Sequence, residues 1–141
     1  MELEGRVWKG GSDPGWLIEV PYLNIMTQGA TKKEALIMIE DAVKLLMEDA
    51  FDGKLFDFTV TFYEKDLFGI KCSEDNYLLA FALRRQREMN KISIREAAKR
   101  LGSKSPNAYA RYEQALVKPT LQKYEQLLHA VNPARHGLLI R

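Results

Sequence analysis

The chain has 141 residues, 46% of them hydrophobic and 28% charged, and its formal net charge is +2 at pH 7. This apolar fraction is sufficient for packed cores and excludes a mostly disordered chain, and the length allows one domain or two small ones. A single cysteine, Cys72, excludes an intrachain disulfide, and with only two histidines it also excludes a Cys/His zinc site. Because no apolar run approaches the ~20 residues that span a bilayer and the first residues lack a signal-peptide pattern, we expect a soluble cytoplasmic protein.

The two halves of the chain carry opposite charge. Residues 1–75 hold 8 lysines and arginines against 15 acidic residues, a balance of −7, whereas residues 76–141 hold 13 against 4, a balance of +9. A basic segment suits a polyanion and an acidic segment suits a cationic partner. We therefore expect two domains, residues 1–73 and residues 76–141, separated by the short polar break at 73–76.

The acidic half begins with short extended segments. Residues 3–9 have weak strand character, the Gly-, Asp- and Pro-containing residues 10–15 favour a turn, and residues 16–21 are rich in β-branched and aromatic side chains. Pro21 ends that strand, and residues 23–27 predict another. This spacing is typical of a small antiparallel meander.

An amphipathic helix follows. Thr31 is a candidate N-cap, Glu34 completes a capping box with it, and Gly53 is a natural stop. Helical spacing predicts the buried face: Ala35, Ile39, Ala42, Val43, Leu46 and Ala50. Residues 58–63 then alternate as in a strand, so the predicted order is β-β-β-α-β.

The acidic half offers little for catalysis. It contains no histidine, and Ser12, Ser73 and Cys72 have no base nearby in the sequence. The carboxylates of Asp13, Glu19, Asp41 and Asp66 could be pictured around Mg²⁺, but we interpret them as solvated surface charge. We therefore expect no enzyme activity, no metal site and no cofactor.

The basic half reads as a series of helices. Residues 76–90 form the first, with Leu79, Ala82 and Leu83 directed inward. Ser93 and Glu96 form a second capping box, which opens a helix that buries Ala97, Ala98 and Leu101 and stops at Gly102. Pro106 is well placed as the first residue of a third helix, and a fourth runs from Leu121 to the Asn132-Pro133 stop. Two short helices joined by a tight glycine turn are the helix-turn-helix arrangement.

The helix from Pro106 must show one face to the core and one outward. Tyr109 and Tyr112 are expected to pack, while Asn107, Ala110 and Arg111 point outward and Ser105 lies at the helix start. Asn pairs with adenine and Arg with guanine in the major groove of DNA. The expected phosphate contacts are Ser103 and Lys104 in the turn, and Lys118 and Thr120 in the later loop near a helix N-terminus.

Residues 83–131 resemble the Cro and lambda-repressor (XRE-like) helix-turn-helix family. The matching positions are Leu83, Arg87, Ile92, Ser93, Ala98, Leu101, Gly102, Tyr109, Glu113, Pro119 and Leu121. The resemblance implies that Arg87 and Glu113 form a partly buried structural ion pair, and that Tyr109 occupies a buried position. Ile94 stands where the family usually has a phosphate-contacting Gln, so one backbone anchor is missing.

Residues 16–48 resemble the N-terminal domain of HicB antitoxins. The positions that match are Pro21, Thr27, Gly29, Thr31, Glu34 and Ala35, and the sequence departs from the family at Leu23-Asn24-Ile25, where Leu-Pro-Gly is usual. The resemblance implies an α+β protein whose N-terminal domain is a degenerate RNase H-like unit without nuclease carboxylates. It also implies that this domain occludes a small basic ribonuclease toxin of the HicA type.

The leading hypothesis is thus an antitoxin that binds a HicA-type toxin and represses its own operon by binding operator DNA. Two helix-turn-helix units would dimerise on a palindrome with half-sites ~34 Å apart, as a homodimer or a higher homo-oligomer. The alternatives are a stand-alone regulator with a ligand-sensing N-terminal domain and a Mg²⁺-dependent nuclease. We interpret His129 and His136 as surface or capping residues, and the apolar tail at 136–141 as a segment that folds back or pairs across a dimer.

Overall fold

The computed structural model describes residues 1–11 and 15–134. The chain divides into two compact units, the first formed by Met1–Asp75 and the second beginning at Asn76. The fold class is α+β, as predicted, with a sheet in the first unit and helices in the second. Part of the predicted turn at 10–15, His136 and the tail at 136–141 lie outside the described residues.

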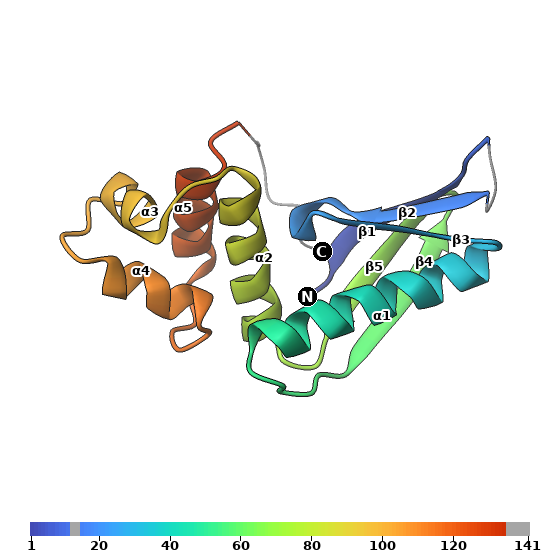
Figure 1. The fold of residues 1–141 in the computed structure, drawn as a ribbon, viewed down its shortest axis with the longest axis horizontal. Coiled ribbons are helices and arrows are strands. Elements are labelled where there is room, and N and C mark those ends of the chain that lie inside the picture. Colours follow the sequence, from blue (N-terminus) through green and yellow to red (C-terminus); the bar gives the residue numbers. More distant parts are fainter. Residues whose placement is uncertain (12–14, 135–141) are drawn as a thin grey trace. The chain divides into compact units, whose positions relative to one another are not determined.

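The first unit is a five-stranded antiparallel sheet with one long helix (Figure 1). Its elements are β1 (Leu3–Lys9), β2 (Trp16–Val20), a 3₁₀ turn η1 (Pro21–Leu23), β3 (Ile25–Gly29), α1 (Lys32–Ala50), β4 (Phe58–Glu64) and β5 (Leu67–Cys72). The strand order is β3-β2-β1-β5-β4, and each neighbouring pair is antiparallel. The strand predicted at 23–27 starts later, because Leu23 lies in η1 and Asn24 adopts a left-handed conformation with φ of 52°.

The predicted order β-β-β-α-β was wrong in one respect, because it lacked β5. This strand lies between β1 and β4, with Leu3 opposite Ile70 and Gly5 opposite Phe68. Gly69 weakens the strand pattern of this short segment, and its partner β1 is more than 60 residues away in the sequence. Only the pairing with β1 and β4 makes the segment a central strand.

Helix α1 lies across one face of the sheet and contacts β1, β2, β3 and β4 (Figure 1). The side chains it buries are Ala35, Ile39, Val43 and Met47. Leu46, predicted to be buried, is exposed, and Ala42 and Ala50 are only half-buried. The buried stripe has an i, i+4 spacing, which is narrower than the face predicted from the sequence.

The predicted N-cap at the start of α1, Thr31, is confirmed, whereas the Glu34 side chain reaches back to the residue before the cap and not to the cap itself. The backbone N–H of Glu34 donates to Thr31 Oγ1 at 3.0 Å, and the carboxylate Oε2 of Glu34 accepts from the N–H of Ala30 at 3.1 Å. Gly29 permits the chain to pass this close to the helix, because a Cβ there would lie 2.5 Å from the backbone nitrogen of Ala35. The cap and the glycine together fix the positions at which β3 ends and α1 begins.

The second unit is helical. Its elements are α2 (Asp75–Met89), α3 (Ile94–Arg100), α4 (Pro106–Glu113) and α5 (Leu121–Val131). Its largest buried side chains include Leu78, Phe81, Leu83, Tyr109, Tyr124 and Leu127. Leu79 and Leu101, which were predicted to point inward, are only half-buried.

Buried hydrogen bonds fasten α2 to the C-terminal helix. The Tyr124 hydroxyl donates to the Leu79 carbonyl at 2.7 Å, and the Asn132 amide donates to Gln86 Oε1 at 2.6 Å. The side chain of Asn90 donates to the Gln86 carbonyl at 2.8 Å. Because Gln86 is fully buried, these bonds satisfy polar groups that would otherwise be costly to bury.

None of the helices in the described part of the chain combines the length and apolarity that crossing a membrane requires.

Candidate nucleic-acid interface

Helices α3 and α4 are joined by a tight turn with well-defined ends. Ser93 caps α3 by accepting the N–H of Glu96 at 3.0 Å, which confirms the second predicted cap. At the other end Gly102 has φ of 75°, and the N–H of Ser103 donates to the carbonyl of Ala98. A left-handed residue at this point lets the following N–H groups donate to the last carbonyls of α3, and it turns the chain toward α4.

The two serines of the turn hold its shape. Ser103 Oγ donates to the carbonyl of Ser105 at 2.8 Å and accepts the Ser105 N–H at 3.3 Å. Ser105 Oγ accepts the N–H of Asn107 at 3.2 Å, so it is the N-cap of α4, and Pro106 occupies the first helical position as predicted. Their hydroxyls thus already serve the turn, while Lys104 between them is exposed.

The outward face of α4 is clear from its burial. Tyr109 and Glu113 are buried, Tyr112 is half-buried, and Asn107 and Arg111 are exposed one helical turn apart. Ala110 was predicted to point outward, but it is half-buried, and Ala108 is exposed instead. Lys104, Asn107, Ala108 and Arg111 follow the i, i+3, i+4, i+7 pattern, which would have identified Ala108 from the sequence.

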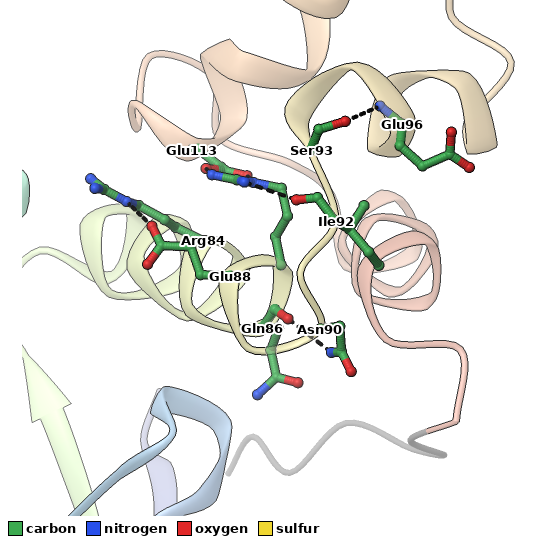
Figure 2. Close-up of polar contacts among 9 residues, drawn as sticks. Arg84, Gln86, Glu88, Asn90, Ile92, Ser93, Glu96 and Glu113 are labelled. Atoms are coloured by element: carbon green, nitrogen blue, oxygen red, sulfur yellow. Dashed lines mark hydrogen bonds and ion pairs between the residues drawn. The ribbon is translucent and has the colours of Figure 1, made fainter.

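Arg87 on α2 and Glu113 on α4 form a two-pronged ion pair. Arg87 Nε lies 2.6 Å from Glu113 Oε2 and Nη2 lies 3.0 Å from Oε1, while Nη1 donates to the carbonyl of Ile92 at 3.0 Å (Figure 2). The side chains are only 13% and 6% exposed. The pair fixes α4 against α2 at the level of the α2–α3 connection, because a planar guanidinium can meet a carboxylate and a carbonyl only in a defined orientation.

Glu113 also shapes its surroundings electrostatically. Its hydrogen bonds raise the pKa of Arg87 above the ordinary arginine value. Burial, followed by the charge of Glu113, raises the pKa of the Tyr109 phenol far above the ordinary tyrosine value. Within the described residues the buried Tyr109 hydroxyl makes no hydrogen bond of ordinary geometry. The inner face of α4 is therefore held to α2 by the Arg87–Glu113 ion pair. Its outer face carries exposed polar and small side chains.

The loop between α4 and α5 carries the remaining predicted contacts. Thr120 is the N-cap of α5, accepting the N–H of Lys123 at 3.1 Å, and Lys118 is exposed. Arg95 and Lys99, which are exposed on α3, were not among the predicted contacts. They lie opposite the buried pair Ala97 and Ala98, so the helical period could have identified them.

No ligating cluster accompanies this surface. Within the described residues no group of three or more His, Cys, Asp or Glu side chains is placed to hold a metal ion. Of the carboxylates considered from the sequence, Asp66 pairs with Arg6 at 3.0 Å and Asp41 is exposed. Cys72 is buried, and burial raises the pKa of its thiol.

The fold and surface of the second unit define a helix-turn-helix module of the kind found in DNA-binding regulators. Residues 83–132 match the helix-turn-helix family model, which supports an XRE-type module over little more than a third of the chain. No curated protein matches the chain.

Proposed function

We propose that this chain is an antitoxin of the HicB type, which represses its own operon through the second unit and binds a HicA-type ribonuclease toxin through the first. The observation that carries the proposal is the charge division, −7 over residues 1–75 and +9 over residues 76–141, with the helix-turn-helix module on the positive side. A repressor needs a cationic surface for DNA, and an inhibitor of an RNA-cutting enzyme meets a cationic partner.

The DNA contacts follow from the exposed face of α4. Asn107 and Arg111 suit direct reading of adenine and guanine, and the small side chain of Ala108 suits contact with a thymine methyl group. Lys104, Lys118, Ser105 and Thr120 would bond to phosphates and fix the register of α4 in the major groove, since the capping oxygens of Ser105 and Thr120 only accept hydrogen bonds. Ser103 would reach a phosphate only by giving up its hydrogen bond to the Ser105 carbonyl. Two copies of the module would occupy a palindromic operator.

The toxin contact is assigned to the first unit, which combines negative charge with exposed apolar side chains. On α1, Leu45 is 65% exposed and Met38 is 40% exposed, next to acidic residues such as Asp41 and Asp49. Such a surface would attract a basic protein by charge and hold it by burial of apolar area. The relation of this unit to the RNase H fold is part of the proposal. We propose a binding protein and not an enzyme, since the unit contains no histidine.

The antitoxin role is tested with the full chain and the product of a neighbouring reading frame, expected to be a basic chain of ~60–90 residues with one key histidine. RNA cleavage by that product should stop when the full chain is added at an equimolar ratio. Cleavage that continues in excess of the chain would exclude the toxin partner and leave a stand-alone regulator, whose operator affinity should then respond to a small molecule.

The DNA role is tested by Arg111→Ala, which removes one base contact. Operator affinity should fall by about 5- to 150-fold, because a good arginine–guanine pair is worth ~1–3 kcal/mol. Fluorescence anisotropy at fixed salt measures this, and inhibition of the toxin should be unchanged.

Arg84→Ala is the charge-matched control, because Arg84 pairs with Glu88 on the exposed side of α2. Equal losses from both substitutions would mean that only net charge matters. Arg111→Lys should recover less than half of the lost binding free energy, because lysine keeps the charge but not the fork of donors.

A further inference from the structure

The two edges of the sheet in the first unit differ in how they are protected. On one edge, β3 is five residues long and leads through Gly29 directly into α1, which packs closely against it. On the other edge, β4 is seven residues long and, within the described residues, pairs only with β5. Its first five residues, FTVTF, contain no proline and no charged side chain of the kind that protects an edge from pairing with another chain. The irregularity in its pairing with β5 lies beyond them, between Phe62 and Glu64.

The first five residues of β4 have a symmetric sequence centred on Val60. Phe58, Thr59, Val60, Thr61 and Phe62 form a palindrome. Two antiparallel copies of β4 centred on Val60 would place Phe58 opposite Phe62 of the second copy and Thr59 opposite its Thr61. Aromatic–aromatic and Thr–Thr pairs are among the favourable cross-strand pairs, and no like charges would be opposed.

An apolar groove lies beside this strand, between β4 and α1. It has a volume of about 420 Å³, and its lining includes Leu36, Ile37, Val60 and Phe62. Ile37 is 50% exposed and Phe62 is 37% exposed, so apolar area remains to be covered. The groove ends in opposite charges, because Lys33 and Glu40 also line it and lie two helical turns apart, on either side of Leu36 and Ile37.

We propose that β4 joins two copies of this chain, antiparallel about a twofold axis at Val60, to form one continuous ten-stranded sheet. The axis would bring the α1 helices of the two copies side by side on the same face, with Lys33 of each copy facing Glu40 of the other. A twofold interface requires such a self-complementary surface, in which each residue finds its partner on the second copy. This inference stands apart from the proposed function, because it rests only on the sheet edge and the groove.

The strand pairing is tested by a site-specific cross-link in the full chain. Opposed residues in antiparallel strands have Cα atoms about 4.5–5.5 Å apart, within the range that a disulfide spans. Val60→Cys should therefore give a covalent dimer under mild oxidation at micromolar protein, at least about tenfold faster than Gln28→Cys. Gln28 is the matched control, because it is exposed on the opposite edge strand β3. The native Cys72 is buried and should not react.

The charge arrangement provides a second, independent test. Lys33→Glu and Glu40→Lys should each weaken self-association by about 5- to 30-fold, because each variant opposes like charges twice in its homodimer. An equimolar mixture of the two variants should form heterodimers about as tightly as the native chain, since both contacts are then attractive. Sedimentation equilibrium measures all three.

Either of two results would overturn the proposal. One is a Val60→Cys chain that cross-links no faster than the Gln28→Cys chain. The other is a mixture of the charge variants that associates no better than each variant alone. Self-association through the second unit cannot imitate the expected results, because neither the cross-link position nor the charge rescue involves that unit.

Discussion

The two units of this protein are stabilised in different ways. The first packs the apolar side of α1 onto an apolar sheet face, through residues such as Ile39, Val43 and Phe68. In the described part of the chain the buried polar or charged side chains are Gln86, Glu113 and Asn132, all in the second unit. Apolar packing is non-directional, whereas buried hydrogen bonds and ion pairs fix orientation. The unit that contains the helix-turn-helix module is therefore the one whose helices are held by directional bonds.

The largest effect is expected from Glu113→Ala in the second unit. It leaves the Arg87 guanidinium with a single carbonyl partner in a poorly hydrated site, which should cost about 3–5 kcal/mol. Urea unfolding followed by helical circular dichroism measures the loss. Glu113→Gln keeps an acceptor and should cost less.

Arg84→Ala serves as the control for this loss. The Arg84–Glu88 pair has similar chemistry, but its side chains are each 43% exposed, so its removal should cost less than ~1 kcal/mol. Equal costs for Glu113→Ala and Arg84→Ala would show that the buried ion pair stabilises the second unit no more than an exposed one does, which would contradict the role given to directional bonds in that unit.

In the first unit, the substitutions that lower stability most should be those that leave a cavity in the apolar core, since no buried ion pair lies among the described residues of that unit. Ile39→Ala removes a fully buried side chain between α1 and the sheet and should cost about 2–5 kcal/mol. Both tryptophans of the chain, Trp8 and Trp16, lie in this unit, so their fluorescence reports its unfolding separately. Leu45→Ala, at a position 65% exposed on the same helix, should change stability by less than ~0.5 kcal/mol.

A smaller effect than those of Glu113→Ala and Ile39→Ala, and one of opposite sign, is expected at Tyr109. Its buried hydroxyl lacks a hydrogen bond of ordinary geometry within the described residues, so Tyr109→Phe should raise the stability of the second unit by about 1 kcal/mol at pH 7. A loss of similar size would instead show that the hydroxyl bonds to the Arg87–Glu113 pair.

The pH dependence of the same variant has a definite sign. The pKa of Tyr109 is raised by burial in the folded chain, so above about pH 10 the unfolded phenol releases a proton that the folded one retains. Stability should therefore fall as the pH rises above about 10, and Tyr109→Phe should remove part of that fall. Unfolding midpoints measured at pH 8 to 11 test this.

Local features of this protein could be predicted from the sequence alone. The caps at Thr31, Ser93 and Ser105, the glycine turn at Gly102 and the proline at the start of α4 depend on contacts within four residues along the chain. The charge division and the helix-turn-helix spacing are likewise properties of the linear chain. These signals were sufficient to predict the α+β class and the segment that resembles a DNA-binding module.

Only the tertiary structure decided which faces and edges are used. It made 67–72 a central strand, buried Met47 instead of Leu46, and exposed Ala108 instead of Ala110. It also left β4 at the edge of the sheet. An edge position is what would allow its palindromic sequence to pair with a second copy, and the strand pattern alone did not predict that position. The physical reason is that strand order and helix rotation depend on partners that are more than 60 residues away in the sequence, and burial depends on how all the elements pack. A cap or a turn, by contrast, depends on a few consecutive residues.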